Sequence, residues 1–96
     1  MIEGGVMKKI AVTVIGADKI GIVAGVVTEL ADMNINILDI SQTILDGIFN
    51  MILICDMEKS NEELKVVQER IENLGKKMGV DARAQLTDIF YSMHRI

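Results

Sequence analysis

The segment of residues 48–55 most constrains the fold, because Asn50 is its single strongly polar side chain. An apolar run of this length beside a turn signal is typical of a strand with both faces largely buried. Asp46-Gly47 directly precedes the run and separates it from another apolar stretch, which is a strong signal for a hairpin. We therefore expect residues 48–55 to form an interior strand paired with the segment before the turn.

Three further strands are expected. Residues 8–15 are β-branched and apolar and end at Gly16, which predicts a central strand. Residues 35–43 mix apolar and polar side chains, which indicates a half-exposed or edge strand. Residues 80–86 alternate strictly between polar and apolar, as a half-buried strand does.

A first helix is expected between the first two strands, with Asp18 as its cap and its end near Met33 and Asn34. Gly21 and Gly25 fall on a separate stripe, where small residues permit close approach. The apolar positions that recur at helical spacing are Ile20, Val23, Val27, Leu30 and Ala31.

A second helix is expected after a capping box that runs from Ser60 to Glu63. Gly79 ends this helix in the usual way. Its apolar stripe consists of Leu64, Val67, Ile71, Leu74 and Met78.

The resulting order, β-α-β-β-α-β, predicts a ferredoxin-like α+β domain over residues 7–96. Two right-handed crossovers place both helices on one face of a four-stranded antiparallel sheet, with the first and third strands inside. A short C-terminal helix starting at Thr87 or Asp88 is also expected, a frayed terminus being the alternative. Residues 1–6 are interpreted as a translated leader or an ordinary flexible terminus. The tail, a partner subunit or both would cover the other sheet face with apolar side chains, which in the tail are Ile89, Phe90, Met93 and Ile96.

Composition excludes several function classes. A chain of 96 residues holds one domain, and a 50% hydrophobic share favours burial against a partner subunit. The net charge of −4 and the scarcity of aromatic residues argue against direct nucleic-acid binding. There is a single Cys, no signal peptide and no apolar run that could span a bilayer, so we expect a cytoplasmic protein without membrane contact.

Catalysis and metal binding are not expected. The loop of residues 16–21 has neither the Cys pair of a metal carrier nor the Arg of a phosphatase. His94 is the only His and lies in the tail, so no nucleophile system is evident. Cys55 is interpreted as a buried small hydrophobe, and Met33, Met51 and Met78 as core residues. We expect no enzyme and no cofactor.

The start of the first helix is the one place suited to a ligand. Unpaired backbone N–H groups at a helix start favour a carboxylate, and Gly21 lets a ligand approach the backbone. The alternative is purely structural: Asp18 only caps the helix and Gly21 only aids packing.

Residues 18–23, Asp-Lys-Ile-Gly-Ile-Val, resemble the signature that opens the first helix of ACT domains. Residues 34–37, Asn-Ile-Asn-Ile, are similar to the start of the second strand in that family, and the ending resembles a free-standing bacterial and archaeal subfamily. The resemblance implies a non-catalytic, regulatory homodimer that binds an amino acid. The ligand-binding residues that it implies are Asp18, Lys19, Ile20, Gly21, Ile22, Val23 and Asn36, the last from the opposite subunit.

Two departures bear on the ligand. Lys19-Ile20 stands where Arg-Pro is common, so the approach to the helix is less rigid. Asp18 replaces an Asn of the serine-binding members, so a ligand with a free amine fits better than one with two acids. The alternatives are a ligand-free interaction and assembly module, a regulator of amino-acid metabolism that acts through a protein partner, and a small ferredoxin-like enzyme. The dimer would form through the second strand as an exposed edge.

Overall fold

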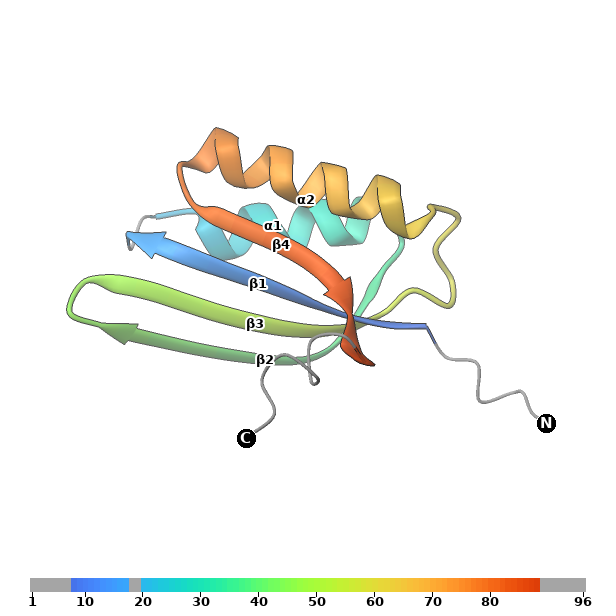
Figure 1. The fold of residues 1–96 in the computed structure, drawn as a ribbon, viewed down its shortest axis with the longest axis horizontal. Helices are drawn as coiled ribbons and strands as arrows, with labels where there is room; N and C mark the ends of the chain where they lie inside the picture. The colour runs from blue at the N-terminus through green and yellow to red at the C-terminus, as the bar shows by residue number, and fades with distance from the viewer. Residues whose placement is uncertain (1–7, 18–19, 89–96) are drawn as a thin grey trace.

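The computed structural model describes residues 8–17 and 20–88, and over these residues it confirms the predicted order of elements. Antiparallel pairs join the strands in the order β2-β3-β1-β4, so β1 and β3 are interior and β2 and β4 form the edges. Figure 1 shows both helices on one face of this sheet, which is the ferredoxin-like arrangement. The elements are β1 (Lys9–Ala17), α1 (Ile22–Asp32), β2 (Asn36–Leu45), β3 (Ile48–Asp56), α2 (Leu64–Met78) and β4 (Asp81–Leu86).

The predicted hairpin joins β2 and β3. Asp46 and Gly47 have φ values of 54° and 78°, the left-handed pair that a tight two-residue turn between antiparallel strands needs. The pairing register shifts between Ile37 and Asp39, which leaves Leu38 as a bulge in the edge strand. The bulge reverses the side-chain alternation near the start of β2.

The core lies between the sheet and the helices. The interior strands contribute one face of side chains, among them Val12 and Leu53, and α2 contributes Val67 and Ile71. The predicted stripe of α2 is confirmed, because its remaining members pack against this core. Cys55 and Met51 are fully buried, as expected for core residues.

The predicted apolar stripe of α1 is confirmed at Leu30, which is buried, and at Val23, which packs against the core, and it is wrong at the other positions. The buried residues are Ile22, Val26 and Leu30, whereas Ile20 is fully exposed in the loop before the helix. The helix begins only at Ile22, after Gly21. The residues that face the sheet therefore recur every four positions from Ile22, and not from Ile20 as predicted. Val23 and Val27 are therefore half-buried and Ala31 is exposed.

Both predicted N-terminal caps are also wrong. Gly21, with a φ of 92°, occupies the N-cap position of α1 in place of Asp18, and no side chain caps the helix. Glu63 occupies the N-cap position of α2, again without a side-chain bond. The Ser60 hydroxyl instead accepts a hydrogen bond from the Glu62 N–H (3.2 Å) and donates one to the Met33 carbonyl oxygen (2.6 Å). Ser60 thus connects the β3–α2 turn to the end of α1 rather than starting a helix.

Gly25 and Gly79 behave as predicted. A Cβ on Gly25 would lie 2.9 Å from the Met78 Sδ, so this position is a close contact between α1 and α2. Gly79 closes α2 with a φ of 74°. Gly21, in contrast, has open space around it, so its role is conformational rather than one of packing.

On the sheet face opposite the helices, the side chains of β3 are more exposed than the prediction of two largely buried faces implies. Within the described ranges Ile52 and Ile54 are half-buried, and Ile15 and Ile48 are exposed. Thr87 and Asp88, where the C-terminal helix was expected to start, are helical. The four apolar residues of that expected helix and the leader at residues 1–6 lie outside the described residues.

Candidate functional site

The start of α1 presents backbone rather than side chains. The Gly25 N–H bonds to the Gly21 carbonyl (2.9 Å), the first such bond of the helix, so the N–H groups of Ile22 and Val23 precede the intrahelical ladder. The Ile22 side chain is buried in the core and that of Val23 packs against it. Of the predicted ligand-binding residues here, Ile22 and Val23 therefore offer only main-chain donors, and Asp18 and Lys19 lie outside the described residues.

Asn36 does not join this group within one subunit. Ile48 of β3 pairs with Ala17 on one side and Leu45 on the other, whereas Asp56 pairs with Lys9 and Asn36. β1 and β2 are therefore parallel to each other, and Asn36 lies at the end of the sheet opposite the start of α1. With 9 residues in β1, the two ends lie roughly 25–30 Å apart at about 3.3 Å per residue.

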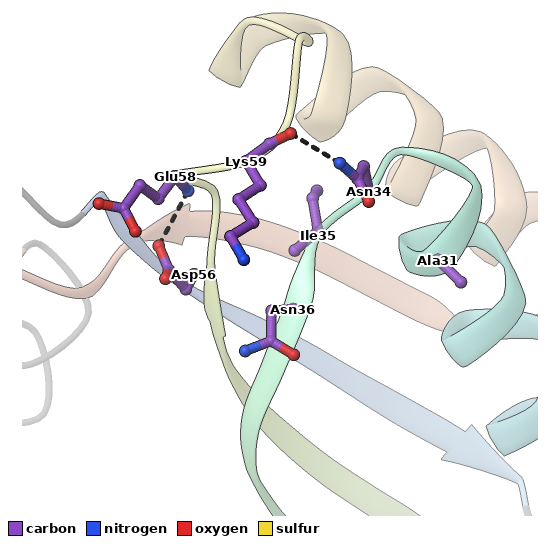
Figure 2. Close-up of a pocket in the computed structure, with 7 residues that line it drawn as sticks. All are labelled: Ala31, Asn34, Ile35, Asn36, Asp56, Glu58 and Lys59. Carbon is purple, nitrogen blue, oxygen red and sulfur yellow. Dashed lines mark hydrogen bonds between the residues drawn. The ribbon is translucent and has the colours of Figure 1, made fainter.

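Asn36 lines a recess of about 510 Å³ that the sequence did not predict. Figure 2 shows this recess where the end of α1, the start of β2 and the turn after β3 meet. The exposed side chains around it are mostly polar. Its lining residues are Ala31, Asn34, Ile35, Asn36, Asp56, Glu58 and Lys59.

Hydrogen bonds fix the rim of the recess. Asn34, which has a φ of 59°, donates from its Nδ2 to the Lys59 carbonyl oxygen (2.8 Å). The Glu58 N–H donates to Oδ1 of Asp56 (2.8 Å). The bond from Asn34 to Lys59 (Figure 2) and the bond from Ser60 to Met33 hold the β3–α2 turn against the end of α1, whereas the Glu58–Asp56 bond lies within the turn itself.

Two polar groups of the recess remain uncommitted. Within the described part of the chain, the Lys59 ammonium forms no ion pair and the Asn36 amide forms no hydrogen bond. Asp56, Glu58 and Lys59 give the lining a net charge of −1, and the negative end of the α1 dipole adds to it. The recess therefore has both donors and carboxylates available to a small polar molecule.

The sequence carried one indirect signal for this recess. Residues 58–62 form the polar stretch between β3 and α2, and residues 34 and 36 are Asn. The register that places Asn36 opposite Asp56 is what brings these two segments together. That register depends on the bulge at Leu38, which sequence periodicity did not reveal.

The described residues also bear on metal binding, cysteine reactivity and membrane insertion. Across residues 8–17 and 20–88, no group of three or more His, Cys, Asp or Glu side chains could hold a metal ion. Burial raises the pKa of the Cys55 thiol to about 12, so this sulfur stays protonated and unreactive at neutral pH. None of the described helices has the length and apolar character needed to cross a membrane.

The ACT-domain family model matches residues 8–85. The chain belongs to the ACT-domain family. This ACT domain is 47% identical over 85 residues to a UPF0237 protein of Methanosarcina acetivorans, covering 88% of the chain and 92% of the relative. It is 46% identical over 90 residues to a UPF0237 protein of Bifidobacterium longum, covering 94% of the chain and 100% of the relative.

A solved structure agrees with the fold. The ACT domain protein from Streptococcus pneumoniae superimposes with a TM-score of 0.77 at 36% identity, over 86% of this ACT domain and 93% of that chain. The relatives are thus free-standing ACT domains of bacteria and archaea. ACT domains are a regulatory domain type whose members commonly bind amino acids.

Proposed function

We propose that the protein is a non-catalytic, cytoplasmic regulator that binds an amino acid as a homodimer. The site combines the start of α1 in one subunit with Asn36 of the other. The residues assigned to it are Asp18, Lys19, Ile20, Gly21, Ile22 and Val23 from the first subunit and Asn36 from the second.

The observation that carries this proposal is the position of Asn36 at the opposite end of the sheet from α1's start. An antiparallel pair of β2 strands, related by a two-fold axis, sets the start of one β2 beside the end of the other. The end of β2 lies at the same end of the sheet as Ala17, where α1 begins. Dimerisation by this route therefore supports a site that one subunit cannot build alone.

The two sheet edges favour β2 for this pairing. β2 exposes Leu38, Ile44 and Leu45, the last with 78% of its surface accessible, and such an edge invites a partner strand. β4 instead carries the ion pair between Arg83 Nε and Asp81 Oδ1 (3.1 Å). Charged edge residues oppose strand addition, so we assign the dimer contact to β2.

The ligand chemistry follows from the residues at both ends of the site. The free N–H groups at the start of α1 suit a carboxylate, and an ionised Asp18 suits an ammonium group. An amino acid carries both groups. The net charge of −4 favours passing the ligand signal to a protein partner rather than to nucleic acid.

A mixing experiment tests the composite site. Calorimetry with the proteinogenic amino acids should identify a ligand of the wild-type dimer, and Asp18→Ala and Asn36→Ala should each weaken its binding about tenfold or more. A heterodimer of the two variants contains one intact site out of two, and random subunit exchange in an equimolar mixture makes about half of the dimers heterodimers. Mixing the variants should therefore restore binding at about a quarter of the wild-type stoichiometry. If the mixture binds no better than either variant alone, Asp18 and Asn36 do not form one site across the interface. If no amino acid binds the wild type, the sensor function is wrong.

A ligand-free assembly module is the second candidate, and the exposed apolar side chains of β2 favour it. It predicts a dimer in sedimentation and no thermal shift with any metabolite. A ligand-induced shift would exclude it.

A further inference from the structure

The recess beside Asn36 holds a charged group that the composite site does not yet use. Lys59 is the one cationic side chain among its lining residues, and it has no ion-pair partner in the described ranges. In Figure 2 its side chain runs back from the turn toward the start of β2, on the side where Asn36 and Asp56 lie. An ammonium and an amide that line one recess supply the donors that a carboxylate requires.

The backbone of Lys59 is anchored, which limits where its ammonium can go. Its carbonyl oxygen accepts the Asn34 hydrogen bond at 2.8 Å, and the residues on both sides of it are also tied down. Glu58 bonds to Asp56 through its N–H, and Ser60 bonds to Met33 through its hydroxyl. The turn therefore projects the Lys59 stem from a fixed point over the recess.

The nearby carboxylates restrict the ligand further. Asp56 uses Oδ1 for the Glu58 N–H, and its second oxygen remains available to an ammonium group. The Glu58 carboxylate is directed away from Lys59 in Figure 2. A dianionic ligand would meet two acids and one Lys, whereas a zwitterion finds a partner for each of its charges.

We propose that Lys59 determines specificity by contacting the carboxylate of a zwitterionic amino acid, together with Asn36 of the same subunit. This inference rests on the proposed function, because Asn36 belongs to both. It places the ligand carboxylate between the N–H groups of α1 in one subunit and Lys59 in the other.

The test compares Lys59→Met with a matched control, Lys65→Met. Methionine keeps an unbranched apolar side chain of similar length and removes the charge, and Lys65 is exposed on α2 away from the recess. Each protein is titrated with the amino acid that binds the wild type and with the corresponding carboxamide, which lacks the anionic group.

We expect the wild type and Lys65→Met to prefer the acid over the amide by tenfold or more. Lys59→Met should bind the acid about five- to tenfold more weakly, with little change for the amide. Equal losses for acid and amide, or no loss at all, would overturn the role of Lys59 while leaving the sensor function intact. Absence of any amino-acid binding by the wild type would overturn both.

Discussion

The Ser60 hydroxyl donates a 2.6 Å hydrogen bond to the main-chain carbonyl oxygen of Met33, across 27 positions of sequence. The bond joins the end of α1 to the turn before α2, and it is partly buried. Since Met33 follows the last turn of the helix, Ser60 supplies a donor to a carbonyl that the helix itself does not satisfy.

Ser60→Ala should lower the free energy of unfolding by about 1 kcal/mol, because a partly buried carbonyl loses its donor. Urea denaturation followed by circular dichroism measures this as a lower midpoint with an unchanged slope. Asn61→Ala is the control, since the Asn61 side chain is exposed in the same turn and no described residue bonds to it. Equal midpoints for the two variants would show that the Ser60 bond contributes nothing measurable.

Gly75→Ala should destabilise the fold, whereas Gly25→Ala should not. A Cβ at Gly75 would lie 2.9 Å from both the Ala82 Cβ and the Val80 carbonyl oxygen, and the adjacent backbone cannot move aside without disturbing β4. We expect a loss of about 1–3 kcal/mol. At Gly25 the obstructing atom is the Met78 Sδ, near the end of a flexible side chain, so better helix propensity should make Ala neutral or stabilising by up to about 1 kcal/mol. Thermal unfolding of both variants checks the pair, and a stabilised Gly75→Ala would contradict the packing argument.

Cys55 should make the fold sensitive to alkali. Burial raises the pKa of the folded Cys55 thiol to about 12, well above its ordinary value of 9.0. Between these two pH values the unfolded thiol loses its proton while the folded thiol keeps it, so stability falls as pH rises through this window. Below pH 9 the contribution is constant. Cys55→Ala should show a smaller decline from pH 9 to 11 than the wild type, measured by urea denaturation at each pH; parallel declines would assign the effect to other groups.

Ile44→Lys should convert the proposed β2-paired dimer to a monomer in sedimentation velocity. The Ile44 side chain is 59% exposed on the edge strand, so a charge there disfavours strand addition without emptying the core. Ile15→Lys is the control: Ile15 is 45% exposed but lies on the interior strand β1, on the uncovered face of the sheet. If only Ile15→Lys disrupts the dimer, the subunits associate through the sheet face instead of the β2 edge.

Periodicity predicted the element order and the sheet because each relevant signal is local. Each of these signals depends only on residues a few positions apart in sequence. They are the Asp46-Gly47 turn, the end of α2 at Gly79 and the apolar spacing from Leu64 to Met78. The edge and interior strands followed from polarity, since an interior strand must bury more side chains than an edge strand.

The helix starts could not be predicted in this way. Ser60 resembles a cap, but its hydroxyl bonds to Met33, a distant partner that only tertiary packing supplies. Which side of α1 faces the sheet likewise depends on where the helix begins, and it begins only after Gly21. Asn36 was recognised as a candidate, whereas Lys59 was not, because strand pairing alone places the two beside one recess.

The strand order also dictates when the domain can fold during synthesis. β1 pairs with β3 on one side and with β4 on the other, so the first strand made has to wait for the last one. Only the β2–β3 hairpin joins neighbours in sequence, and it is available early to seed the structure. On the ribosome, a nascent chain lacking β4 would leave one flank of β1 unpaired, and completion of the sheet would coincide with emergence of residues 81–86.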